Sequence, residues 1–231
     1  MIVQKHAHET WCISQLDHAK LASDLLIQLN NYQKLPPKQK KALYHAARFH
    51  DHGWKHYDTN PMYKKNSTIP LDFTEISTST HIEIWTASRH LINTKEKLSK
   101  YLICTHNIYL ANIRASNTDN HVDKKKLSNF LTTEKEIQYT LKQALKPLYS
   151  KNTLDELSHL LKLVDWMSLT VCLNKKIPYV SFSTNLNISN YPKIKCEPSL
   201  NKTPITFNVT ATKICSKSQK IETSALKLTF N

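Results

Sequence analysis

The segment HAARFHDHGWKHYD, residues 45 to 58, concentrates side chains that bind metal ions and transfer protons. It holds four of the twelve histidines of the chain, and it contains the adjacent pair His50-Asp51. Neighbouring residues on a helix point about 100° apart, but a cation at the end of a helix can be reached by both an imidazole and a carboxylate. Mixed imidazole and carboxylate ligands suit Mn, Fe, Zn, Ni or Co. The pair therefore predicts a metal site at a helix end.

Gly53 is the only glycine among 231 residues, and it follows Asp51 by two positions. Helices commonly end at a left-handed residue, a conformation that glycine adopts without steric cost. We therefore expect Gly53 to be left-handed and to turn the chain away from the metal site.

Four more potential ligands lie in segments with helical spacing of apolar residues: His18, His81, His106 and Asp165. Asp165 stands in LLKLVDWMSL, the most apolar of these segments. An ionised carboxylate there is costly unless it is paired or bound to a metal. A single core histidine is usually a hydrogen-bonded structural residue. A separate structural role would have to be assumed for each of these residues, whereas one shared metal site accounts for all of them.

The order His, His-Asp, His, His, Asp resembles the HD-domain superfamily of metal-dependent phosphohydrolases, which is named for its His-Asp doublet. The resemblance covers about residues 15 to 173. It implies that one metal is bound by four residues, His18, His50, Asp51 and Asp165. It also implies that His81 and His106 complete a second site, so that each chain holds one or two divalent ions. More narrowly, QLDHAKLA, HDHGW, HIEIW and VDWMSLTVCL resemble a bacterial HD-like family of conserved hypothetical proteins, which names no substrate.

The chemistry expected from this resemblance is hydrolysis of a phosphate ester or nucleotide. A bound metal lowers the pKa of a water ligand and polarises the phosphoryl oxygen, and Asp51 or Asp165 can orient that water as the catalytic carboxylate. The residues expected to contact the substrate are Lys55, Trp54, Arg89 and Arg114.

Two other functions fit the same residues. A minority of the superfamily are di-iron oxygenases with the same ligand order, in which a lysine follows the doublet's aspartate by three residues; here that position is Trp54, and Lys55 comes one step later. The other function is that of a non-catalytic, metal-stabilised module that binds a nucleotide or RNA.

The formal charge of +14 comes almost entirely from lysines, in runs interleaved with asparagine. We interpret these lysines mainly as a solvated face; the alternative is that they attract anionic substrates or polymers. The expected partner is a small anionic substrate, and the net charge also allows nucleic acid. Five widely spaced cysteines predict reduced thiols, and no apolar run is long enough for a membrane span or a signal peptide. These features predict a cytoplasmic protein that does not enter a membrane.

The elements that must position these residues follow from the periodicity of the sequence. Apolar spacing and breaking residues predict six helices, at about residues 16–29, 38–52, 81–92, 95–112, 127–145 and 153–173. Residues 57 to 80 read as a long loop, which in a compact domain is often a functional lid. After residue 176, YVSF, ITFNVTAT and ALKLTF are typical of strands.

The predicted fold is therefore mainly α: an HD-like helical bundle with a small antiparallel β appendage from the C-terminal segment, which an N-terminal hairpin can join. We divide the chain into a helical metal-binding domain at residues 1–176 and a β-rich extension packed on it at residues 177–231.

Overall fold

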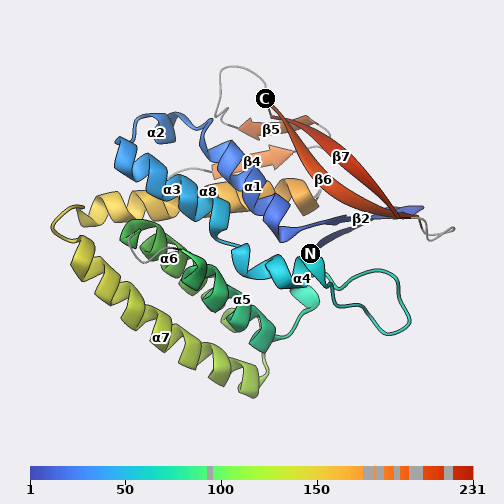
Figure 1. The fold of residues 1–231 in the computed structure, drawn as a ribbon, viewed down its shortest axis with the longest axis horizontal. Coiled ribbons are helices and arrows are strands. Elements are labelled where there is room, and N and C mark those ends of the chain that lie inside the picture. The colour runs from blue at the N-terminus through green and yellow to red at the C-terminus, as the bar shows by residue number, and fades with distance from the viewer. Residues whose placement is uncertain are drawn as a thin grey trace.

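The computed structural model describes residues 1–92, 96–173, 179–180, 185–189, 193–197, 205–215 and 221–230. The chain is mainly helical with a small β appendage, which confirms the predicted fold class. Figure 1 shows the helices gathered on one side of the molecule and the sheet on the other.

In the described part, six helices are longer than ten residues, and each corresponds to one predicted from the sequence: α1 (Gln15–Leu26), α3 (Pro37–Phe49), α5 (Thr78–Leu91), α6 (Lys97–Ser116), α7 (His121–Leu145) and α8 (Lys151–Leu173). The largest difference in start is at α7, which begins six residues earlier than the predicted start at residue 127. Its N-cap, Asn120, accepts hydrogen bonds from the backbone N–H groups of Val122 and Asp123. Because this cap starts the helix at His121, the lysine run that follows is helical.

The predicted loop at residues 57 to 80 is shorter than expected. Its first residues belong to α4 (Lys55–Thr59), the 3-10 turn η2 (Phe73–Glu75) lies within it, and α5 starts earlier than predicted. Asp72 and Glu75 form a capping box around η2, an arrangement of side chains that hydrophobic periodicity does not reveal. A short helix, α2 (Asn30–Gln33), was also not predicted.

The prediction that Gly53 is left-handed is wrong, because no described glycine has a positive φ. Gly53 instead lies in the 3-10 turn η1 (His52–Trp54), pressed against α5. A Cβ at this position would overlap the carbonyl oxygen of Ile84 and lie 2.9 Å from Ser88 Oγ. Glycine is needed here for close approach between two backbones.

The sheet joins the two ends of the described chain. Its strands run in the order β1-β2-β6-β7-β5-β4-β3. Their bounds are β1 (Ile2–Lys5), β2 (Glu9–Ile13), β3 (Tyr179–Val180), β4 (Asn185–Ser189), β5 (Lys193–Glu197), β6 (Ile205–Cys215) and β7 (Ile221–Phe230). The predicted N-terminal hairpin forms and pairs with β6, with Cys12 opposite Thr212. The pairings are antiparallel except that of β5 with β7, which is parallel.

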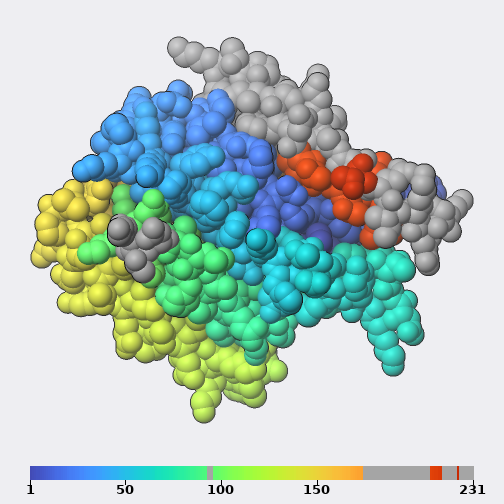
Figure 2. Space-filling model, viewed as in Figure 1, coloured from blue at the N-terminus to red at the C-terminus, as the bar shows by residue number. Residues whose placement is uncertain are grey.

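One buried core connects the bundle to the sheet. It contains apolar residues of α1, α3, α6 and α8 together with Ile2 and Ile13 of the hairpin and Val209 and Ala211 of β6. In the space-filling view the described residues of β6 lie beside the N-terminal segment (Figure 2). Among the described helices, none is both long enough and apolar enough to cross a membrane.

Candidate metal centre

Two histidines from different helices face one carboxylate oxygen. Nε2 of His18, on α1, lies 2.9 Å from Oδ1 of Asp165, on α8. Nε2 of His50, which caps the C-terminus of α3, lies 3.1 Å from the same oxygen. All three side chains are buried. Residues far apart in the sequence therefore meet where α1, α3 and α8 pack together.

The second nitrogen of each ring is already occupied, and this assigns the tautomers. His50 Nδ1 donates to the carbonyl oxygen of Ala47 at 2.8 Å. Ser168 Oγ donates its only hydrogen to the carbonyl oxygen of Asp165, so it accepts from His18 Nδ1 at 3.0 Å. In neutral rings both Nε2 lone pairs then point at the carboxylate. Such an arrangement requires a cation or a proton between the groups.

Asp51 adds a second carboxylate. Its Oδ2 lies 3.6 Å from His18 Nε2 and 3.5 Å from His50 Nε2. Burial raises the pKa of Asp51. Burial also opposes ionisation of Asp165, but His106, His18 and His50 outweigh it and hold the pKa of Asp165 well below its ordinary value. The pair of carboxylates thus carries negative charge in a buried place, where a cation stabilises it.

His106, on α6, is the clearest indication that a ligand belongs here. Neither ring nitrogen has a hydrogen-bond partner within the described residues, although the side chain is buried. Burial lowers the pKa of His106 to about 3, which near neutral pH favours the uncharged ring with one lone pair. Its Nε2 lies 3.4 Å from Asp165 Oδ2. A buried imidazole without a partner is costly, and a metal ion would satisfy it.

The donor atoms form two overlapping groups among the described residues. His18, His50 and Asp51 form one, and His50, His106 and Asp165 form the other; within each group the atoms lie no more than 4.8 Å apart. Five of the six predicted ligands are thus brought together. This geometry is compatible with a metal ion, and the choice of donors suits a first-row transition metal.

His81 is not a member of either group. It lies on the first turn of α5, where its ring stacks on Trp85 at 5.2 Å and meets the edge of Trp54 at 5.7 Å. Its Nδ1 is buried without a hydrogen-bond partner among the described residues. The sequence placed His81 beside His106, whereas the structure places it across a cavity.

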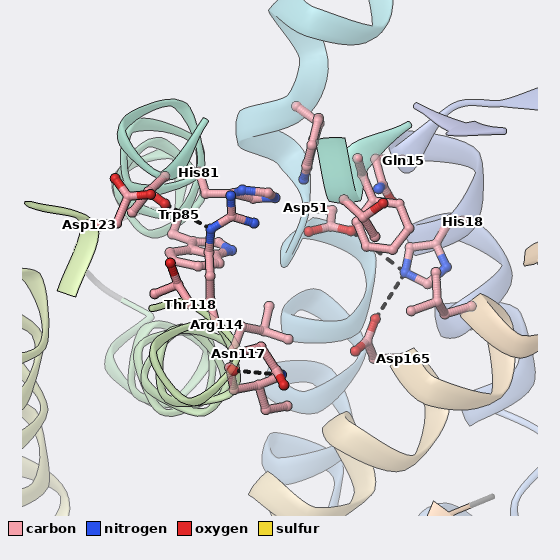
Figure 3. A pocket seen from close by; sticks show the side chains of 17 residues that line it. Gln15, His18, Asp51, His81, Trp85, Arg114, Asn117, Thr118, Asp123 and Asp165 are labelled. Atoms are coloured by element: carbon pink, nitrogen blue, oxygen red, sulfur yellow. Dashed lines mark hydrogen bonds and ion pairs between the residues drawn. The ribbon is translucent and has the colours of Figure 1, made fainter. Parts of the chain in front are cut away.

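That cavity has a volume of about 440 Å³ and opens beside the cluster. Figure 3 shows His18, Asp51 and Asp165 on one wall and His81, Trp85 and Arg114 on the facing wall. The remaining lining residues are Gln15, Trp54, Phe73, Thr74, Thr78, Leu110, Ile113, Asn117, Thr118, Asp123 and Leu169. The volume suits a small molecule.

The four predicted substrate contacts separate into two pairs. Arg114 and Trp54 line the cavity. Lys55 is exposed and does not line it. Arg89 is buried elsewhere, with its Nε 2.8 Å from Oε1 of Glu134 on α7, an ion pair that leaves it unavailable to a substrate in the cavity.

The aromatic residues do not offer an evident stacking surface for a nucleobase. Trp85 is covered by His81 on one side and by Phe130 at 5.6 Å. Trp54 is buried and meets Tyr57 and His81 through edge contacts. These rings therefore form the wall of the cavity and hold α5 in place.

Two residues of the site were not predicted from the sequence: Ser168, which orients His18, and Asp123, which lines the far end of the cavity. Ser168 follows Asp165 by three residues and so shares its face of α8. That spacing is the one signal from which its role could have been inferred. No comparable signal marks Asp123, because its position depends on how α7 packs.

Comparison with known proteins gives a family but no activity. No curated protein and no solved structure matches the chain. A family model described as "Protein of unknown function (DUF3891)" matches residues 1–223. The match extends over the hairpin, the helices and most of the sheet, and the chain therefore belongs to this family.

Proposed function

We propose that this protein is a metal-dependent hydrolase of the HD superfamily that acts on a phosphate ester. The observation that carries the proposal is the convergence of five buried ligand residues, three of which (His18, Asp51 and Asp165) line one wall of a cavity whose facing wall holds an arginine. The order of these ligands along the chain is the order that suggested the superfamily. The proposed place of the protein is the cytoplasm, where its cysteines would remain reduced.

The residues that would hold the metal are His18, His50, Asp51, His106 and Asp165. The unpartnered nitrogens of His106 and the orientation of Nε2 of both His18 and His50 toward Asp165 support this assignment. When bound, a divalent transition metal would supply Lewis acidity and a water of lowered pKa. The position of His81 across the cavity supports one ion per chain in place of two.

The protein's own side chains would divide the remaining work. Asp51 lines the cavity and lies farther from the imidazoles than Asp165 does, so its carboxylate would accept the proton of an attacking water. Asp165 would hold the rings of His18 and His50 in position. Arg114 would face the phosphoryl oxygens and stabilise their charge from the opposite wall.

The test combines elemental analysis with an activity screen. Protein purified without chelator is analysed for Mn, Fe, Zn, Ni and Co, and then assayed with generic phosphate esters and nucleotides in the presence of each metal. We expect about one transition metal per chain and metal-dependent release of phosphate.

Asp51→Asn should abolish turnover, whereas Asp155→Asn, the same change on the exposed face of α8, should leave turnover unchanged. Release of phosphate by Asp51→Asn at the rate of the wild type would contradict the proposal. Absence of turnover together with iron-dependent uptake of oxygen would replace it with the oxygenase alternative. Bound metal without either activity would favour the binding module.

A further inference from the structure

The cavity holds one guanidinium among its described lining residues. Among the described residues that line it, three are aspartates, Asp51, Asp123 and Asp165, and Arg114 is the only lysine or arginine. Burial and the charge of Arg114 lower the pKa of His81 to about 3, so this histidine is neutral. The positive charge available to a ligand on this wall is therefore concentrated at one guanidinium.

Arg114 is held in place by the start of α5. Its Nε donates to Thr78 Oγ1 at 3.1 Å, and its Nη2 donates to the carbonyl oxygen of Ile76 at 2.8 Å. A guanidinium has five N–H groups, so three remain without an acceptor within the described residues. A fixed guanidinium with free donors matches the geometry of a phosphoryl group.

The first turn of α5 contributes to the same wall. Thr78 and His81 both line the cavity, and both are buried. Ser77 caps the helix by accepting from the N–H of Thr80. The positive, N-terminal end of the helix lies beside the cavity, because Thr78 is its first residue. The unpartnered Nδ1 of His81 shows that this wall is not satisfied by the described protein groups alone.

We propose that Arg114, Thr78 and His81 form a phosphoryl-binding subsite that works without the metal, on the wall opposite the metal ligands. The inference rests on the proposed function and deepens it, because it assigns the wall that holds the substrate's phosphoryl group. Asp123, in the first turn of α7, lines the cavity too. Its carboxylate acts electrostatically on Arg114 and would repel an anion more strongly the more negative charge that anion carries, so we assign the substrate class as a monophosphate ester in preference to a diphosphate.

The experiment is calorimetric titration of inorganic phosphate into the full chain, as purified and again after chelation. We expect binding in both samples. Arg114→Gln should weaken it by about tenfold or more, as expected for loss of a charged hydrogen bond. Lys55→Gln removes the same charge from an exposed residue outside the cavity and should leave binding unchanged.

Two further variants keep the test decisive if Arg114→Gln does not fold. Thr78→Val retains the shape of the side chain but removes the hydroxyl that fixes Arg114, and it should weaken phosphate binding by a smaller factor. Asp123→Asn should increase the affinity for pyrophosphate more than that for inorganic phosphate, because pyrophosphate carries more negative charge.

The proposal is overturned if chelated wild-type protein does not bind phosphate, or if Arg114→Gln and Thr78→Val both bind it as the wild type does. Tighter binding of pyrophosphate than of phosphate by the wild type would overturn the monophosphate assignment. Loss of the subsite with metal-dependent turnover intact would leave the hydrolase proposal standing. Binding that depends on Arg114, without turnover under any metal, would leave the subsite standing and reject the hydrolase.

Discussion

The backbone N–H of Gly53 donates a 2.9 Å hydrogen bond to Oγ of Ser88. The turn that follows the His50-Asp51 pair is thereby fastened to α5, the helix that carries His81. This hydrogen bond thus connects η1, which directly follows Asp51, with α5, which contributes to the opposite wall of the cavity. The position of both walls depends on a residue without a side chain.

Gly53→Ala should lower the free energy of unfolding by about 1–3 kcal/mol, the usual cost of overpacking, because the methyl group would overlap the carbonyl oxygen of Ile84. Gly53→Asn should cost at least as much, since its side chain is larger. Urea denaturation measures both. Ser88→Ala is the matched control: it removes the hydroxyl at a cost of about 0.5–1.5 kcal/mol, and it should not rescue Gly53→Ala because the Ile84 carbonyl remains. A milder effect of asparagine than of alanine would contradict the packing explanation.

Metal content should separate His81 from the cluster. We expect His106→Gln and Asp165→Asn to lower the metal bound per chain, because each removes a donor atom from the converging group. His81→Gln should retain the metal. Mass spectrometry of the metals in the purified variants makes the comparison. Equal loss in His81→Gln and His106→Gln would mean that His81 is a ligand after all and that a second ion is bound.

Ser168→Ala should weaken metal binding by about 10–100-fold, the usual effect of losing a group that orients a ligand, because His18 Nδ1 loses its acceptor. Ser158→Ala is the control on the same helix. Ser158 is also buried, and its hydroxyl bonds only the helix backbone, at Leu154, so its loss should leave metal binding unchanged. Competition with a chromogenic chelator gives both affinities. Identical affinities in the two variants would show that Ser168 does not orient His18.

Arg89→Met should destabilise the protein by about 3–5 kcal/mol, because it leaves the buried carboxylate of Glu134 without its cation. The double variant Arg89→Met with Glu134→Leu should recover most of that loss. Thermal denaturation of the two single variants and the double variant measures the coupling. Phosphate binding in the double variant should equal that of the wild type, since neither residue lines the cavity. Additive losses in the double variant would show that the two charges do not stabilise each other.

Chelation of the metal should lower the melting temperature, and adding back the ion should restore it, because the cation neutralises two buried carboxylates. Asp51→Asn should be less sensitive to chelator than the wild type, since it binds less metal at the start. Calorimetry with and without chelator provides the measurement. A melting temperature that is independent of chelator in metal-loaded wild-type protein would exclude a structural contribution of the metal.

The helices could be predicted from the periodic spacing of apolar residues, and the five cluster residues could be predicted because polar or charged side chains are unusual in such segments. Asp165 and His106 stand out among apolar neighbours, and a period of 3.6 residues fixes the face on which each lies. Contacts that depend on how the helices pack have no such signal in the sequence. The separation of His81 from His106 follows from the packing of α5 against η1, and the ion pair of Arg89 depends on the position of α7.

The need for glycine at position 53 also could not be predicted, because it too depends on how two segments pack. A glycine that follows a helix is expected to adopt a positive φ, because that conformation is a local property of the chain. Close approach to Ile84 is a property of two segments, and nothing in residues 45 to 58 indicates it. The parallel pairing of β5 with β7 is likewise determined by chain topology and not by strand composition.

The pairing of β2 with β6 has a consequence for the order of assembly. The cluster residues, from His18 to Asp165, all lie in the segment that this pairing closes into a loop. Closing a long loop costs entropy before its contacts repay that cost, so we expect the helices to associate first and the two strands to meet last. The bundle would then gather its ligands while β2 still exposes unpaired backbone groups along one edge. Such an edge recruits other chains, and the interval before β6 arrives is the period in which aggregation competes with folding.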